Sequence, residues 1–161
     1  MLHDLYSVGY LNPGALDLLQ ERVDRGAIVV DIRLVAGSRY RPQFSAKRLR
    51  ERFGEAYLRA PELGNVNYNQ AGAPIVLLNP TQGIPRLLDL LEHTDICLLC
   101  KCQQFATCHS ALVVAEVQRA CPSIVFARLG EEIAHGLPKS ALTHQYKLNK
   151  RRIYVPDAAN N

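Results

Sequence analysis

The chain has 161 residues, of which 48% are hydrophobic, so it has the length of one ordinary domain and can bury a core without metals or disulfides. No apolar run reaches the roughly 20 residues that cross a bilayer, and residues 1–10 lack the pattern of a secretion signal. We therefore expect a cytoplasmic protein without a membrane partner, and its formal net charge of +4 is modest.

The first third of the chain predicts a strand, a helix and a second strand. Residues 5–10 have a short β-type pattern. Asn12 suits the N-cap of the following helix, with Pro13 at its first position and Gly26 just beyond its end. The β-branched run "AIVVDIR" then predicts a strand that is covered on both faces.

The middle of the chain is less regular. A loop rich in Gly, Pro and Arg, "AGSRYRPQF", precedes a helix that Ser45 caps, and "AYLRAPELGN" contains a short strand. Residues 66–80 contain Gly and Pro that favour a loop, although "PIVLLN" fits either a strand or part of a helix.

The last part alternates helices and strands clearly. Ile84, Leu87, Leu88 and Leu91 recur with the spacing of one helix face, and "DICLLC" reads as a buried strand. "HSALVVAEVQRAC" then predicts a helix and "SIVFARL" a final strand.

This alternation predicts a single α/β domain over residues 1–140, with a mostly parallel sheet flanked by helices and right-handed crossovers. From Ala141 the chain is polar and basic, so residues 141–161 are expected to form an extended C-terminal tail. The sequence gives no indication of the oligomeric state.

Ligands of open parallel sheets bind outside the carboxyl ends of the strands. Three polar segments are delivered to that edge by the predicted topology: Asp31 with Arg33, the loop 38–44 with Arg39 and Arg41, and the loop 100–109. Guanidinium groups that converge there can clamp a phosphate, sulfate or carboxylate. The alternative is that Arg33 pairs with Asp31 or with Glu62 and fastens the loops.

Four of the five cysteines lie between Cys97 and Cys108, too close together for a disulfide framework. A strand, a loop and a helix N-terminus favour ionisation of a thiol in the loop. The leading hypothesis is a cysteine-dependent transferase or hydrolase that binds a small anionic substrate and needs no cofactor. Its site residues would be Cys100 or Cys108 as nucleophile or redox thiol, His109 to tune that thiol, Arg33, Arg39 and Arg41 to hold the anion, and Asp31 to orient the arginines.

Two other interpretations of the cysteines stay open. Cys100, Cys102, Cys108 and His109 offer the donors of a structural zinc site, although their spacing is not that of a zinc finger. The thiols can also fill a strand–helix junction by packing, which is the preferred account for Cys97 and Cys121. Cys97 and Cys100 are three apart in a strand and should point to different faces.

Nucleic-acid binding is the rival to an enzyme. The segment 33–52 is rich in Arg and Lys, and a second basic cluster lies near the C-terminus at residues 147–152. The chain contains no tryptophan, and its 15 acidic residues nearly balance its 19 basic ones.

Several motifs occur together in a characteristic order: "SVGYLNPGALDLL", "VVDIRLVAGSRYRPQF", "APELGN" and "LLCKCQQFATCHSALVVAEV". From about Tyr6 to Leu129 the chain resembles the family called domain of unknown function 488. The matching positions are Gly9, Tyr10, Asn12, Asp31, Arg33, Ser38, Arg39, Pro42, Phe44, Pro61, Leu63, Gly64, Cys100, Cys108 and His109.

The resemblance implies an α/β fold and a common site of Asp, Arg, Cys and His, and it implies no particular reaction. The chain departs from the family pattern at two positions. Ser110 stands where the family usually has Arg after Cys-His, and Cys102 is an additional thiol. The loss of that arginine places any anion-binding role more heavily on Arg33 and Arg39.

Overall fold

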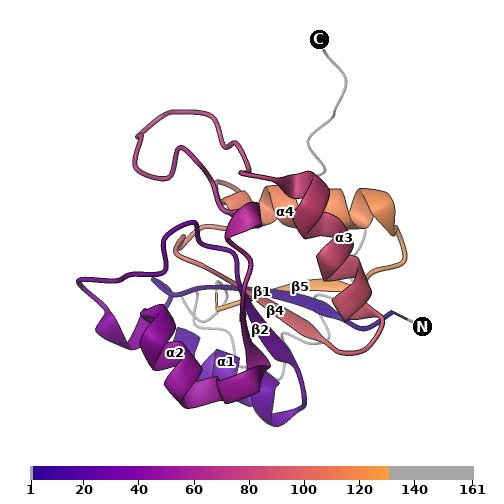
Figure 1. Ribbon diagram of the computed structural model, residues 1–161, viewed down its shortest axis with the longest axis horizontal. Coiled ribbons are helices and arrows are strands. Elements are labelled where there is room, and N and C mark those ends of the chain that lie inside the picture. The colour runs from indigo at the N-terminus through magenta and orange to yellow at the C-terminus, as the bar shows by residue number, and fades with distance from the viewer. Residues whose placement is uncertain (1, 131–161) are drawn as a thin grey trace.

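A computed structural model describes residues 2–130 of the chain and shows five strands and four α-helices within them (Figure 1). In chain order the elements are β1 (Leu5–Gly9), α1 (Ala15–Asp24), β2 (Ile28–Asp31), α2 (Ala46–Phe53), β3 (Tyr57–Arg59), α3 (Pro80–Leu91), β4 (Ile96–Cys100), α4 (His109–Ala120) and β5 (Phe126–Leu129). None of the helices in this part of the chain is long and apolar enough to cross a membrane.

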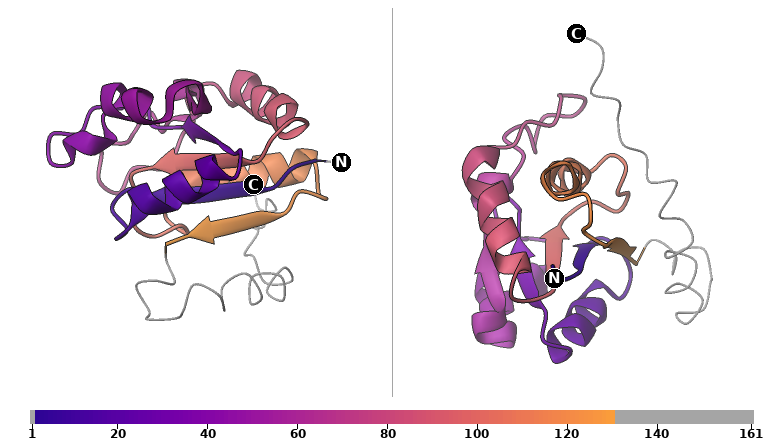
Figure 2. Two further views of the ribbon diagram at one scale, coloured as in Figure 1. Left: turned by 90° about the horizontal axis from the view of Figure 1, so that it is seen from below. Right: turned by 90° about the vertical axis from the view of Figure 1, so that its right-hand side faces the viewer.

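All strands are parallel, in the order β3-β2-β4-β1-β5, which confirms the predicted α/β class. From β1 the chain moves through β2 to β3 in one direction and then returns through β4 to β5. Because β–helix–β crossovers are right-handed, this reversal places α1 and α2 on one face of the sheet and α3 and α4 on the other. Figure 1 and the right-hand view of Figure 2 show the sheet between these two pairs of helices.

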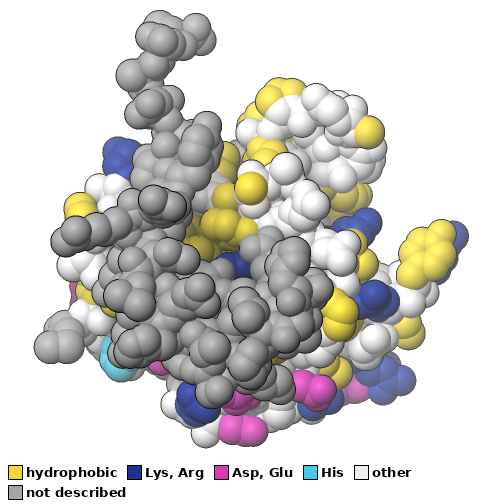
Figure 3. Space-filling model, turned by 180° about the vertical axis from the view of Figure 1, so that it is seen from behind, with side chains coloured by type: hydrophobic (Ala, Val, Ile, Leu, Met, Phe, Trp, Pro, Cys, Tyr) yellow, Lys and Arg dark blue, Asp and Glu magenta, His cyan; other side chains and the backbone are white. Residues whose placement is uncertain are grey.

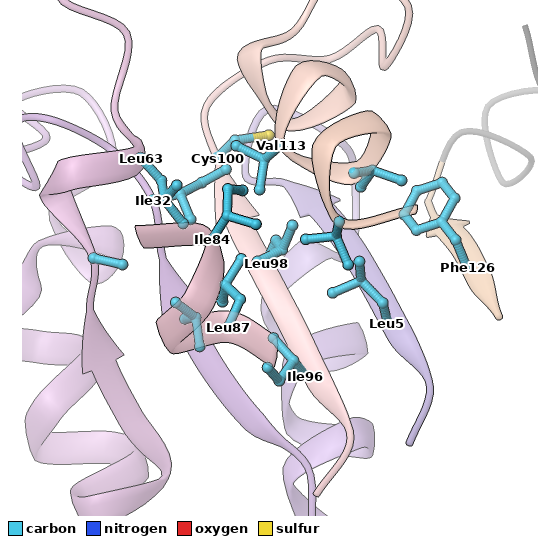
Figure 4. Close-up of a cluster of buried hydrophobic side chains, with 14 of the residues drawn as sticks. Leu5, Ile32, Leu63, Ile84, Leu87, Ile96, Leu98, Cys100, Val113 and Phe126 are labelled. Carbon is cyan, nitrogen blue, oxygen red and sulfur yellow. The ribbon is translucent and has the colours of Figure 1, made fainter. Parts of the chain in front are cut away.

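Each face of the sheet has its own hydrophobic core. One core packs strand side chains such as Val8 and Leu99 against α1 and α2. The other packs Leu98 and Ile96 against α3 and α4, and Figure 4 shows these side chains between the sheet and the helices. Cys97 belongs to the first core and Cys100 to the second, so the two thiols point to opposite faces as predicted.

The start of α1 differs from the sequence prediction. Asn12 does not cap the helix; the N-cap is Gly14, which has a φ of 70°, and the helix begins at Ala15. Asn12 is buried, and its side-chain amide donates to the carbonyl of Gln103 at 3.3 Å. Its polar side chain is therefore engaged with the loop after β4 and is not available to the helix.

The ambiguous segment before α3 is a loop. It contains one isolated bridge between Asn65 and Leu77, and "PIVLLN" is neither strand nor helix up to Asn79, the N-cap of α3. Other sequence predictions agree with the structure: Ser45 caps α2, and α4 begins at His109. The N-cap of α4 is Cys108. The predicted tail, residues 141–161, lies outside the described residues.

Candidate functional site

The carboxyl end of β4 lies at the centre of the candidate site. Its neighbours β1 and β2 lead into helices on one face of the sheet, whereas β4 leads into α4 on the other. Connections that leave adjacent strands toward opposite faces open a crevice at this edge. Backbone hydrogen bonds join the segments there, from Tyr10 N to Cys100 O at 3.0 Å and from Ile32 N to Leu99 O at 3.1 Å.

Asp31 and Arg33 form a buried ion pair at the end of β2. The Arg33 Nε donates to Asp31 Oδ1 at 2.8 Å, and its Nη2 donates to Oδ2 at 2.6 Å. The two side chains are 0% and 5% exposed. Tyr57 donates its hydroxyl to the same carboxylate at 2.6 Å, and Phe44 O accepts from Arg33 Nη2 at 2.7 Å. Arg33 is thus fixed in one orientation by its carboxylate.

The Asp31 carboxylate raises the pKa of Arg33 and of Tyr57. Burial lowers the pKa of Arg33, but the hydrogen bond and charge of Asp31 outweigh it, so the net shift is upward. Burial and the Asp31 charge raise the pKa of Tyr57, so the tyrosine remains a hydrogen-bond donor. Arg33 Nη1 has no hydrogen-bond partner among the described residues although it is buried.

The three arginines that were predicted to hold an anion do not share one environment. Arg33 lies with its guanidinium carbon 5.2 Å from the centroid of the Tyr10 ring. Arg41 Nη1 donates to the backbone oxygen of Tyr10 at 2.6 Å, which ties the loop after β2 to the end of β1. Arg39 is exposed and does not line the pocket described below.

Two cysteines and a histidine gather between β4 and α4. The donor atoms of Cys102, Cys108 and His109 all lie within 4.8 Å of one another, and Cys108 Sγ is 3.8 Å from His109 Nδ1. The His109 Nε2 lies 3.1 Å from the backbone oxygen of Ile32. Cys108 also caps α4, since its sulfur accepts from the backbone N–H of Ser110 at 3.5 Å.

Cys100 contacts this group from inside the core, at the end of β4 (Figure 4). Its sulfur accepts from Arg128 Nη1 at 3.6 Å and is 3.7 Å from the Ser110 hydroxyl. The same Arg128 donates to Ser7 Oγ at 2.8 Å and to the backbone oxygen of Cys102 at 2.9 Å. A buried guanidinium from β5 therefore lies next to the clustered sulfurs.

Hydrogen bonds among the three thiols lower the pKa of Cys100 and raise the pKa of Cys102 and of Cys108. Hydrogen bonds from Cys102 and Cys108, together with the charge of Arg128, hold the pKa of Cys100 well below its usual value. The hydrogen bond with Cys100 and burial raise the pKa of Cys102 and of Cys108. Burial lowers the pKa of His109, which favours the neutral imidazole.

A pocket of about 210 Å³ opens against this cluster. Among the described residues that line it, the charged groups are Arg33 and Lys101, and no carboxylate is present. Cys102 and His109 lie in its wall, whereas Cys100 and Cys108 are 0% and 1% exposed and do not line it. The remaining lining residues are Tyr10, Leu34, Val35, Gly37, Asn65, Tyr68, Ile75 and Thr107.

The structure brings together most of the residues singled out in the sequence. Asp31, Arg33, Cys102, Cys108 and His109 meet at one edge, with Cys100 behind them. Tyr57, Lys101 and Arg128 also belong to the site, although no role was predicted for them from the sequence. A charged residue inside the apolar pattern of the last strand was the available signal for Arg128.

The fold and the site define an α/β protein with a Cys/His cluster at the carboxyl edge of a parallel sheet. The family model described as "Domain of unknown function DUF488" matches residues 16–74, which supports the family suggested by the sequence motifs. The matched residues contain Asp31 and Arg33 and end before the Cys/His loop. None of the curated proteins and none of the solved structures with which the chain was compared matches it.

Proposed function

We propose that this protein is a cysteine-dependent transferase or hydrolase that acts on a small anionic substrate in the pocket beside β4. The proposal rests on the lining of the pocket. The sulfur of Cys102 and the imidazole of His109 lie there with two cations, Arg33 and Lys101, and none of the described lining residues is a carboxylate. A concave site with a few convergent polar groups is the usual form of a small-molecule site.

Cys102 is the sulfur that meets the substrate in this proposal. Cys100 and Cys108, the nucleophiles favoured by the sequence, are buried behind it. His109 is a neutral imidazole with a ring nitrogen within 4.8 Å of the Cys102 sulfur, and it accepts the proton of the thiol. The Cys102 sulfur then forms a bond to the electrophilic atom of the substrate, and the leaving group departs with the electron pair of the broken bond. The group held on sulfur then passes to water in a hydrolase or to a second acceptor in a transferase.

Arg33 and Lys101 hold the anion. Arg33 is oriented by Asp31, and its Nη1 retains a donor that no described residue uses. Lys101 is exposed, lines the pocket and adds a second positive charge. A reducing compartment keeps thiols such as Cys102 reduced, and we propose the cytoplasm as the location of the protein.

Competing alkylating reagents test the proposal. Metal-free, reduced protein is treated with iodoacetate or with uncharged iodoacetamide, and the modified peptides are quantified by mass spectrometry. The pocket charges should increase the iodoacetate-to-iodoacetamide rate ratio at Cys102 above the ratio at Cys121. Cys121 is a matched internal control, because it is also partly exposed and lies outside the pocket. Equal ratios at the two cysteines would contradict the proposal.

Nucleic-acid binding is the second candidate function, favoured by the exposed side chains of Arg39, Lys47, Arg48 and Arg50. Arg48 is paired with Glu51, and on the face seen in Figure 3 acidic side chains alternate with basic ones along the lower edge. A mixed surface of this kind supports the second candidate less strongly than the pocket supports the first. Binding to DNA or RNA that weakens steeply with salt would favour it.

A further inference from the structure

The cluster of Cys102, Cys108 and His109 has a geometry close to that of a tetrahedral metal site. Zinc–sulfur and zinc–nitrogen bonds of about 2.3 and 2.0 Å place neighbouring ligand atoms about 3.5 to 3.8 Å apart in a tetrahedron. Cys108 Sγ and His109 Nδ1 are 3.8 Å apart, and the whole set lies within 4.8 Å. A small closure of the Cys102 loop would bring all three donors to one ion.

The orientation of His109 fits a ligand. A backbone carbonyl only accepts hydrogen bonds, so the contact between His109 Nε2 and the oxygen of Ile32 places the ring proton on Nε2. Nδ1 then carries the lone pair, and it faces the sulfur of Cys108. Metal-binding histidines almost always donate their second ring N–H to a carbonyl or carboxylate in this way.

The donor set selects the class of ion. Two thiolates and one neutral imidazole suit Zn²⁺, and their two negative charges balance the charge of the ion. A complex without net charge is favourable here, because the buried guanidinium of Arg128 already places a positive charge beside the sulfurs and would repel a second one. The sulfur of Cys100 is not among the ligand atoms that lie within 4.8 Å of one another. The chain therefore supplies three ligands, not the four suggested by the sequence.

We propose that Cys102, Cys108 and His109 bind one Zn²⁺ whose fourth coordination position opens into the pocket. Cys102 and His109 both line that pocket, so an exogenous ligand can reach the ion from it. Three protein ligands with an open position are typical of catalytic zinc. This inference rests on the proposed function, since the anionic substrate would occupy the fourth position, and it adds that the ion keeps Cys102 deprotonated at the pocket.

Cobalt and zinc binding test the site on the full-length, reduced, chelator-treated protein. Co²⁺ should give a thiolate charge-transfer band and the visible bands of a tetrahedral complex, and elemental analysis after dialysis against Zn²⁺ should give about one ion per chain. Removing a residue that only hydrogen-bonds to a metal ligand weakens metal binding about tenfold to a hundredfold. Cys102→Ser replaces a ligand itself, so it should weaken Co²⁺ binding at least about tenfold. Cys121→Ser should bind like the wild type.

Co²⁺ binding without a thiolate band, a Zn²⁺ content near zero, or equal affinity in Cys102→Ser and Cys121→Ser would overturn the inference. The elemental analysis uses the wild type and does not depend on the folding of a variant, and urea unfolding of the metal-free variants checks their fold. The iodoacetate preference of Cys102 is measured on metal-free protein. If that preference holds while metal binding fails, only the metal site is lost and the proposed function stands.

Discussion

Arg33 is a charged side chain with 5% exposure, and such a group is costly to bury without a partner. Asp31 balances its charge through two short hydrogen bonds, and Tyr57 completes the hydrogen bonding of the carboxylate. The ion pair therefore fixes where the guanidinium lies relative to the pocket. Of the interpretations offered by the sequence, the pairing of Arg33 with Asp31 is confirmed, and Arg33 also lines the pocket wall.

Replacing Asp31 by Asn tests this pair. The amide preserves the volume of the side chain but removes its charge, which leaves the guanidinium of Arg33 buried without a counter-ion. The free energy of unfolding should fall by about 3–5 kcal/mol, as expected when one partner of a buried pair is removed. The measurement is urea denaturation. Glu51→Gln, which breaks the exposed pair with Arg48, is the control and should cost less than about 1 kcal/mol.

Lys101 contributes charge to the pocket without packing in the core. Lys101→Gln should reduce the iodoacetate-to-iodoacetamide rate ratio at Cys102 about fivefold, because one unit charge a few ångströms from a reagent in a wet pocket is worth roughly 1 kcal/mol. Unfolding should be unchanged within about 0.5 kcal/mol. Lys47→Gln, an exposed change on α2, should leave the ratio unaltered. A ratio that is the same in both variants would remove Lys101 from anion binding.

The elements around the site approach each other closely where β1 passes the loop after β4. A Cβ on Gly9 would lie 1.6 Å from the backbone oxygen of Cys102, so only glycine fits between the two segments. The last residue of β1 thereby sets the position of the loop that carries the accessible sulfur. This contact makes Gly9 part of the site, although it lies far from Cys102 in the sequence.

Gly9→Ala should push the Cys102 loop away from β1. We expect a loss of about 1–3 kcal/mol in the free energy of unfolding from overpacking, together with a changed alkylation rate at Cys102. Gln43→Ala, an exposed change outside the pocket, is a suitable control. The prediction fails if urea unfolding and the Cys102 rate are the same in the two variants.

Local sequence patterns predicted the elements well where a single physical signal dominates. The periodicity of Ile84, Leu87 and Leu91 corresponds to α3, and the apolar run ending at Cys100 corresponds to β4. The pattern was misleading at Asn12, whose side chain binds the carbonyl of Gln103, 91 residues away. A capping residue and a residue that binds a distant loop have the same local sequence, so only tertiary contacts distinguish them.

At the scale of the whole molecule, the strand order decides which residues meet. The sequence predicted parallel strands and the convergence of Asp31, Arg33 and the Cys/His loop, because carboxyl ends share one edge. It did not predict that β5 would lie beside β1, with Arg128 opposite Ser7. The position of Arg128 next to the sulfur of Cys100 depends on this non-local pairing, which no local pattern encodes.

Arg128 joins the edge strand, the first strand and the site loop through a single buried side chain. Its guanidinium donates to Ser7, Cys100 and the backbone of Cys102, and it is 2% exposed. Arg128→Gln cannot reach all three partners and leaves buried acceptors unpaired, at about 1–3 kcal/mol for each group that loses its partner.

We therefore expect urea denaturation of Arg128→Gln to show a loss of at least about 2 kcal/mol. Arg119→Gln is the control, since Arg119 is 76% exposed and pairs with Glu116 within α4. The control should change stability by less than about 1 kcal/mol. Equal stabilities of the two variants would mean that β5 is held by its backbone pairing with β1 and by the packing of Phe126, and that the guanidinium adds nothing to the assembly of the sheet around the site.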